Sequence, residues 1–195
     1  MSHKTDILII GAGAAGLMAA YGAGSTADCK VTVLEKMPRP GRKIMITGKG
    51  RCNVTNNCTD DEFFANIPVN SRFLYSAYSR FDCRDCMDFF ESCGVPLKTE
   101  RGNRVFPVTD KAYSVLECLQ NELRRSRVTV KTARVQSILT EDGKACGVKT
   151  QNEVIHANWV ILATGGASYP TTGSTGDGYT IAAELGHTII PAEGS

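Results

Sequence analysis

A glycine-rich turn between two short apolar runs constrains the fold of this chain more than any other feature. The run TDILII at 5–10 has the length of a buried strand, and GAGAAG follows it at 11–16. Apolar residues then recur at helical spacing before a second apolar run, CKVTVLE, at 29–35. The order strand, tight turn, helix, strand over roughly thirty residues is typical of a βαβ unit with parallel strands.

The turn matches the pattern GxGxxG, which predicts a diphosphate site in this context. Gly11 permits the tight turn, Gly13 lets the backbone approach a ligand, and Gly16 lets helix and strand pack closely. Amides at the start of the predicted helix, together with the helix dipole, favour a bound diphosphate. The predicted contact residues are Gly11, Gly13, Ala14, Ala15 and Gly16.

Glu35 lies at the end of the second predicted strand, where an acidic residue belongs in this motif. Its carboxylate is placed to accept hydrogen bonds from ribose hydroxyls, and it would repel a 2′-phosphate. The alternative is a purely structural glycine turn followed by a solvent-facing glutamate. Because strand, turn, helix, strand and acid occur in register, we favour the binding interpretation.

Two further glycine-rich segments carry candidate binding residues. Residues 37–57 have glycines among basic residues and no steady period, which predicts a long ordered loop able to wrap the rest of a dinucleotide. A cation there would stabilise an anionic reduced flavin, although a solvated basic loop is the alternative. Ala163, Thr164 and Gly165 end an apolar strand and let the backbone pass close to a cofactor, with a simple turn as the alternative.

The rest of the chain indicates a mixed α/β protein. Helices are predicted at 60–67, 71–93, 110–125 and 180–187, the third capped by Asp110. The core candidates of the second helical region are Phe73, Ala77, Phe81, Met87, Phe89 and Phe90. A hairpin around Gly102 is predicted at 97–107, an antiparallel meander with a turn at Asp142–Gly143 at 128–157, and a strand returning to the parallel sheet at 159–166.

Composition excludes several classes of protein. The 195 residues carry a net charge of +2, which gives no reason to expect a polyanion as the main partner. No run approaches the roughly 18 apolar residues of a membrane span, and the N-terminus lacks the features of a signal peptide. We therefore expect a cytoplasmic protein whose eight cysteines are free thiols. The CxxC at 83–86 lacks an evident preceding strand or helix N-terminus, and the cysteine spacing predicts no metal site.

Three segments, GAGAAGLMAA, GRKIMITGKGRCNVTN and ATGGASYPTTGSTGDGY, occur in an order and at separations that resemble one family. The chain is similar to the BaiN/RdsA-type NAD(P)/FAD-dependent oxidoreductases, also described as aminoacetone-oxidase-like or YhiN-type flavoproteins, from about Thr5 to Pro191. The resemblance implies an α/β, Rossmann-like FAD-binding domain of the two-dinucleotide-binding class, with a parallel sheet and an antiparallel meander. Residues 1–195 would be the N-terminal part of that domain, without the inserted substrate domain and the C-terminal segment.

The resemblance also implies which residues meet the cofactor. Gly11, Gly13, Ala15 and Gly16 would contact the pyrophosphate, Glu35 the ribose, and Val135 the adenine through its backbone. Ala163, Thr164 and Gly165 would pass beside the FAD, and Ser168, Tyr169 and Gly173 to Asp177 would lie on the reactive side of the flavin. The residues lining the cofactor's path would be Lys36, Arg42, Lys43, Thr47, Gly48, Arg51, Cys52 and Asn53.

The expected activity is a flavin-dependent oxidoreductase in which NAD(P)H reduces FAD, and FAD passes electrons to a small organic substrate or oxygen. No residue is identified as a general acid or base, and the sequence does not fix the substrate or the oligomeric state. The alternatives are a plain NAD-dependent Rossmann dehydrogenase, a non-catalytic truncated nucleotide-binding fragment, and a flavoprotein that modifies RNA. Balanced charge argues against the last, so no nucleic-acid partner is expected.

Overall fold

The computed structural model describes residues 3–26 and 28–191, which form two units along the chain. The first unit comprises residues up to Lys43 together with those from Leu119 onward, and the second comprises Ile44–Cys118. The boundaries fall within two helices, α2 (Arg42–Ile46) and α6 (Ala112–Arg125). Among the described residues, no helix is long and apolar enough to cross a membrane.

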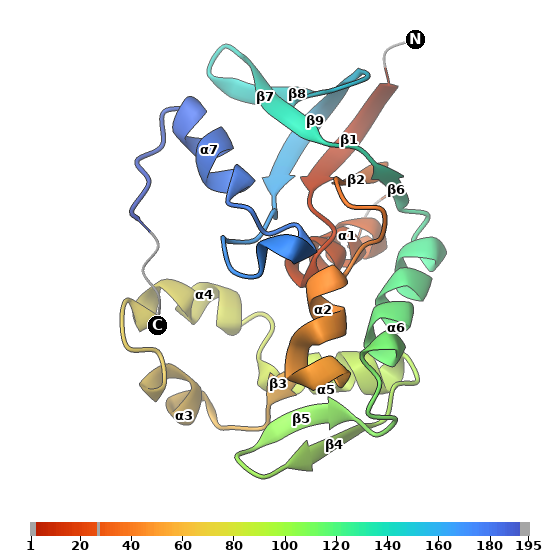
Figure 1. Ribbon diagram of the computed structural model, residues 1–195, viewed down its shortest axis with the longest axis vertical. Helices are drawn as coiled ribbons and strands as arrows, with labels where there is room; N and C mark the ends of the chain where they lie inside the picture. Colours follow the sequence, from red (N-terminus) through yellow and green to blue (C-terminus); the bar gives the residue numbers. More distant parts are fainter. Residues whose placement is uncertain (1–2, 27, 192–195) are drawn as a thin grey trace. The chain divides into compact units, whose positions relative to one another are not determined.

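The first unit is built on a six-stranded sheet in the order β6-β2-β1-β9-β8-β7 (Figure 1). Neighbouring strands from β6 to β9 pair in parallel, and β9, β8 and β7 pair antiparallel. The strands are β1 (His3–Ile10), β2 (Val31–Glu35), β6 (Thr129–Thr132), β7 (Val135–Glu141), β8 (Lys144–Thr150) and β9 (Val154–Leu162). The predicted α/β fold with a parallel sheet and a meander is therefore confirmed.

The helices of this unit follow the predicted order. Helix α1 (Ala14–Thr26) connects β1 to β2, which gives the βαβ unit expected from the glycine turn. Helix α7 (Asp177–Glu184) begins three residues before the predicted 180 and follows the short 3-10 helix η3 (Pro170–Thr172).

The meander differs from its prediction at both ends. Strand β6 was predicted as its first strand, yet it pairs in parallel with β2, from Thr32 with Thr129 to Glu35 with Thr132. The strands predicted separately at the end of the meander and at 159–166 are one continuous strand, β9, which pairs with β8 along one edge and β1 along the other. The turn at Asp142 and Gly143 is confirmed, and both residues have the positive φ that a type I′ hairpin requires.

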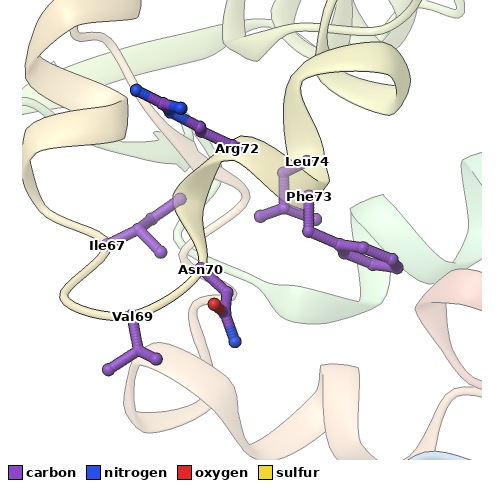
Figure 2. Close-up of a pocket in the computed structure, with 6 residues that line it drawn as sticks. All are labelled: Ile67, Val69, Asn70, Arg72, Phe73 and Leu74. Atoms are coloured by element: carbon purple, nitrogen blue, oxygen red, sulfur yellow. The ribbon is translucent and has the colours of Figure 1, made fainter.

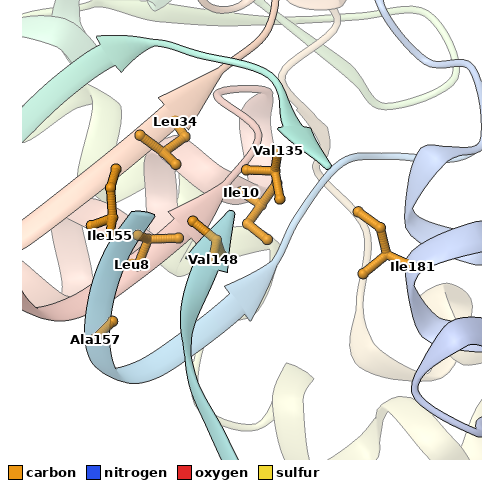
Figure 3. Close-up of a cluster of buried hydrophobic side chains, with 8 residues drawn as sticks. All are labelled: Leu8, Ile10, Leu34, Val135, Val148, Ile155, Ala157 and Ile181. Atoms are coloured by element: carbon orange, nitrogen blue, oxygen red, sulfur yellow. The ribbon is translucent and has the colours of Figure 1, made fainter. Parts of the chain in front are cut away.

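A cluster of buried apolar side chains joins the parallel sheet, the meander and α7 (Figure 3). Its members come from β1, β2, β7, β8, β9 and α7, and Leu8 and Val148 have no solvent exposure. They are Leu8, Ile10, Leu34, Val135, Val148, Ile155, Ala157 and Ile181. Because the cluster draws on both parts of the sheet, the meander is held against the strands that carry the glycine turn.

The second unit contains a three-stranded sheet in the order β3-β5-β4 and several short helices. The strands are β3 (Thr55–Asn56), β4 (Leu97–Glu100) and β5 (Arg104–Pro107), and the last two form the predicted hairpin around Gly102. The helices are η1 (Thr47–Gly50), α3 (Asp60–Ala65), η2 (Ser71–Leu74), α4 (Tyr75–Tyr78) and α5 (Cys83–Ser92).

The prediction of one helical stretch over 71–93 was wrong because a new helix is capped within it. Asp82 has an extended backbone and accepts a hydrogen bond from the Asp85 amide at 2.7 Å, while the Asp85 carboxylate accepts one from the Asp82 amide at 3.0 Å. This capping box starts α5 and breaks the helical phase. As a result Phe89 and Phe90 are buried as expected, Met87 is half-buried, and Phe73, Ala77 and Phe81 are exposed, Phe73 by 85%.

Two other local predictions are corrected. The region 37–57 is not one loop, since it contains α2, η1 and β3, and the Ile44 side chain of α2 is buried. Asp110 does not cap α6, which begins at Ala112. Its backbone has φ of 53°, and its carboxylate forms ion pairs with Lys98 at 2.6 Å and Arg51 at 3.2 Å.

We predict that Leu8→Ala lowers the free energy of unfolding of the first unit by about 2–5 kcal/mol, because it removes a fully buried side chain from the central cluster. Urea unfolding measures the change. The matched control is Gln136→Ala at an exposed position of β7, expected to change stability by less than about 0.5 kcal/mol. A loss below about 1 kcal/mol for Leu8→Ala would show that the cluster does not hold the unit together.

Candidate dinucleotide-binding site

The predicted strand–turn–helix junction is present at residues 10–14. Strand β1 ends at Ile10, Gly11 turns the chain with φ of 103°, and α1 begins at Ala14. The Gly11 amide donates to the Leu34 carbonyl at 2.8 Å, so the turn starts directly from the paired strands. The first amides of a helix have no carbonyl partner within the helix, which leaves α1 the donors that a diphosphate requires.

The three glycines of the motif differ in what a side chain at each position would meet. A Cβ at Gly11 would collide with the carbonyl oxygen of Ala163, and one at Gly16 would collide with the carbonyl oxygen of Gly11. A Cβ at Gly13 would meet no atom within 4 Å. The fold itself therefore requires Gly11 and Gly16. At Gly13 the protein leaves open space, which fits a position where a ligand approaches the backbone.

Glu35 is held against this turn by two backbone amides. Its Oε2 accepts a hydrogen bond from the Ala12 amide at 2.8 Å, and its Oε1 accepts one from the Met37 amide at 2.8 Å. The side chain is half-buried at the end of β2. Each carboxylate oxygen keeps a further lone pair, so the fixed carboxylate can accept hydrogen bonds from a diol next to the glycine turn.

The segment 163–176 forms a second glycine-rich loop beside the first. The Ala163 amide donates to the Ile10 carbonyl at 2.9 Å, which extends the pairing of β9 with β1 to the start of this loop. The loop closes on itself, because the Gly176 amide donates to the Gly166 carbonyl at 3.3 Å and Ser174 is buried. Thr164 is half-buried, and Gly165 has φ of 74°. Because the atoms nearest a Cβ at Gly11 are backbone atoms of Ala163 and Thr164, these residues, followed by Gly165, lie beside the first glycine turn.

Two predicted cofactor lysines are bound to the second loop. Lys36 Nζ donates to Thr175 Oγ1 at 2.6 Å and to Asp177 Oδ2 at 2.9 Å. Lys43 Nζ donates to the carbonyl oxygen of Ser168 at 2.8 Å and to its Oγ at 3.1 Å. The hydrogen bond from Thr175 and the pairing with Lys36 lower the pKa of Asp177, so its carboxylate stays charged at neutral pH.

The remaining candidates of the first unit take different positions. Arg42 is exposed at the start of α2. Val135 is buried at the start of β7, where it belongs to the apolar cluster and pairs with Thr150. The Ala12 and Met37 amides that hold Glu35 were not predicted from the sequence. A backbone donor leaves no signal in residue type, so only the spacing from the glycine turn to the acid hinted at the contact.

Two candidates of the second unit, Gly48 and Arg51, pack against the Phe106 ring. Arg51 lies over this ring, with its guanidinium carbon 4.0 Å from the ring centroid. A Cβ at Gly48, which has φ of 56°, would lie 2.8 Å from the ring and 2.9 Å from the Asn53 amide nitrogen. The Cys52 amide donates to the Thr47 carbonyl at 3.0 Å. The structure therefore groups these predicted residues, with the Asn53 side chain exposed.

The charge of Arg51 is balanced within the second unit. Its Nη1 lies 2.9 Å from Glu100 Oε1 and 3.2 Å from Asp110 Oδ1. Hydrogen bonds from Arg51 and Lys98 lower the pKa of both carboxyl groups. These partners of Arg51, namely Glu100, Asp110 and Phe106, were not predicted from the sequence, because they lie far along the chain on the hairpin and the segment after it.

None of the eight cysteines forms a disulfide, and the described residues contain no cluster of three or more His, Cys, Asp or Glu able to hold a metal. The structure corrects one detail, since the CxxC does lie at a helix N-terminus: α5 begins at Cys83. Burial is nevertheless the main influence on the neighbouring thiols, and it raises the pKa of Cys52, of Cys58 and of Cys86, the last to about 11. High thiol pKa values disfavour a nucleophilic role.

We predict that Gly16→Ala destabilises the chain in the absence of any ligand, by about 1–3 kcal/mol, because the new methyl group overlaps the Gly11 carbonyl. Gly13→Ala is the matched control and should leave the free energy of unfolding within about 0.5 kcal/mol of wild type. Denaturant unfolding of both variants measures the contrast. Equal losses would contradict the separate roles of the two glycines.

We also predict that Cys86 reacts with iodoacetamide about two orders of magnitude more slowly at pH 8 than a thiol of ordinary pKa, because only the thiolate reacts. Mass spectrometry of the Cys86 peptide gives the rate, and a cysteine-containing peptide in the same tube is the control. The rate should keep rising with pH without a plateau below about pH 10. A plateau near pH 8.5 would contradict the raised pKa.

Comparison with known proteins places this architecture in a family. The family model described as "HI0933-like protein Rossmann domain" matches residues 5–194. The chain is 37% identical over 184 residues to the 3-dehydro-bile acid delta(4,6)-reductase of Clostridium scindens, with 94% of this chain and 44% of the relative covered. It is 30% identical over 189 residues to the ribosomal RNA dihydrouridine synthase of Escherichia coli, with 97% and 46% covered. The chain thus spans somewhat less than half the length of these relatives.

The fold is also found in solved structures. The open conformation of a flavocytochrome c3 fumarate reductase superposes with a TM-score of 0.66 at 21% identity, over 94% of this chain and 41% of that one. A second structure, THI4 of Thermovibrio ammonificans, gives a TM-score of 0.58 at 17% identity, over 87% and 61%. These likenesses show the fold. The resemblance inferred from the three sequence motifs is confirmed, and the chain belongs to the HI0933-like protein Rossmann domain family.

Proposed function

We propose that this chain is the FAD-binding part of a flavin-dependent oxidoreductase. The observation that carries the proposal is the Glu35 carboxylate, fixed by two amides beside the first turn of α1. The open space at Gly13 lies in the same turn. A helix N-terminus suits a diphosphate and a fixed carboxylate suits a ribose diol, so the two together fit the ADP half of FAD.

Each group of this chain has a defined part in the proposed site. The α1 amides bind the diphosphate, Glu35 accepts hydrogen bonds from the ribose hydroxyls, and the loop 163–176 supplies backbone beside both. Bound FAD would supply the ring that accepts and donates hydride. A reduced nicotinamide, NADH or NADPH, is the proposed electron donor, and a small organic molecule is the proposed acceptor.

The relatives favour a second candidate acceptor. Two relatives, at 30% and 28% identity, are named ribosomal RNA dihydrouridine synthase. The expectation that no nucleic acid is a partner is therefore not supported, and a uracil base in RNA is the second candidate. The small organic acceptor stays first, because the relative at 37% identity is named a bile acid reductase. NAD(P)H oxidation stimulated by a ribosomal RNA fragment and not by a bile acid would reverse this order.

We predict that the chain binds FAD, and that Gly13→Ala weakens the affinity by about tenfold or more while the stability of the ligand-free chain is unchanged. The added methyl group would occupy the space next to the diphosphate. Titration followed by flavin fluorescence measures the dissociation constant, and the absorbance spectrum shows whether the purified protein carries flavin. Glu141→Gln, an exposed carboxylate on β7, is the control.

The same titration separates the alternatives. Binding of NAD without binding of FAD would favour a plain NAD-dependent dehydrogenase. A colourless protein with no thermal shift in FAD would favour a non-catalytic fragment, and either result would overturn the proposal. Equal FAD affinities of wild type and Gly13→Ala would remove the assignment of the diphosphate to this turn.

A further inference from the structure

Two segments that follow the strands on either side of β1 are tied together across the carboxyl end of the first unit's sheet. Residues 36–43 follow β2, and residues 163–176 follow β9. Besides the Lys43 contact with Ser168, Lys36 Nζ donates to Thr175 Oγ1 at 2.6 Å and to Asp177 Oδ2 at 2.9 Å. The Lys36 and Asp177 side chains are only 21% and 25% exposed, so this ion pair is partly shielded from solvent.

Asp177 is the centre of these contacts. It is the first residue of α7, where a negative charge also interacts favourably with the helix dipole. Its Oδ1 accepts a hydrogen bond from Thr175 Oγ1 at 2.6 Å, its Oδ2 accepts one from Lys36, and Arg134 Nη2 lies 3.9 Å from Oδ2. One carboxylate thus connects the end of β2, the end of the second loop and the residue before β7.

The ion pair leads directly to the residues of the dinucleotide site. Gly173, with φ of 102°, packs so closely on Met37 that a Cβ there would lie 2.8 Å from Met37 Cγ. The Met37 amide donates to Glu35 Oε1 at 2.8 Å, and the Gly41 amide of the same segment donates to the Ala12 carbonyl at 2.8 Å. A loop anchored at Lys36 therefore packs on the side chain of Met37, the residue whose backbone amide binds Glu35.

We propose that Asp177 is a positioning residue for the dinucleotide site: by holding Lys36 it fixes the second loop, 163–176, beside the first glycine turn and keeps the Met37 amide on Glu35. The proposal rests on the proposed function. Lys36, predicted to line the cofactor's path, would then act by holding the loop, because the charge of its ammonium group is balanced by Asp177. A loop fixed before binding loses less conformational entropy when the ligand arrives, which raises affinity.

The experiment uses the whole chain and the variants Lys36→Met, Asp177→Asn and the double variant. Hydrogen–deuterium exchange of peptides covering 163–176 reports loop order without cofactor, and FAD titration reports affinity. Each single variant should speed loop exchange and weaken FAD binding by about tenfold. The double variant should be no worse than either single one, because both remove the same interaction. Lys36→Arg should restore most of the affinity.

Lys131→Met is the matched control. It removes another lysine–carboxylate pair of the first unit, Lys131 with Glu153 at 3.8 Å, whose side chains are each 35% exposed. Both readouts should stay within about twofold of wild type. If the Lys36–Asp177 pair only stabilised the fold, Lys36→Met and Asp177→Asn would lower the thermal unfolding midpoint without changing loop exchange and FAD affinity together.

The outcomes separate the two proposals. If wild type binds FAD but loop exchange is unchanged in Asp177→Asn, or the two substitutions have additive effects on affinity, the positioning role is overturned and the proposed function stands. If wild type does not bind FAD or NAD, the proposed function fails and the positioning role fails with it. Coupled losses in both readouts, reversed by Lys36→Arg, support both.

Discussion

The close approach of backbone at Gly11 is the constraint on which the site depends. Side chains are excluded there in two directions, because a Cβ at Gly11 would meet the Ala163 carbonyl and one at Gly16 would meet the Gly11 carbonyl. The start of α1 and the end of β9 can therefore lie in backbone contact. Their adjacency brings two loops together at the carboxyl end of the parallel strands, which is where open α/β sheets bind ligands.

The charges around these loops are arranged by mutual pairing. Lys36 forms an ion pair with Asp177, and Lys43 donates a hydrogen bond to Ser168, so both ammonium groups already have partners within the protein. Under the proposed function, the positive potential offered to a diphosphate would come from the amides at the start of α1, whose orientation is already fixed before a ligand binds. Glu35 adds a fixed negative charge next to them, which suits a neutral diol and disfavours a phosphate at the same position.

The sequence predicted those parts of the fold in which local pattern and tertiary contact agree. Gly11 to Glu35 gave the βαβ unit correctly, because the motif's spacing is itself set by backbone packing between adjacent strands. Prediction from the sequence failed where a contact with a residue distant along the chain decides the local structure. Nothing local marks β6 as a neighbour of β2, and Asp110 has the residue type of a helix cap, yet it pairs with Lys98 and Arg51. The break at Asp82 had a local signal, the capping box with Asp85, which helical periodicity obscured.

Under the proposed function, the comparisons bear on which half of the chemistry this chain would determine. Almost the same stretch of the chain, 94% and 97% of it, matches relatives named for a bile acid and for ribosomal RNA. A region shared by proteins with such different named substrates is expected to serve a function that these proteins share. Gly13 and Glu35 can form a dinucleotide site, which would be such a function. Choice of acceptor would then depend on parts of the relatives that this chain does not span. Substitutions at the glycine turn should consequently alter cofactor affinity without changing which acceptor is preferred.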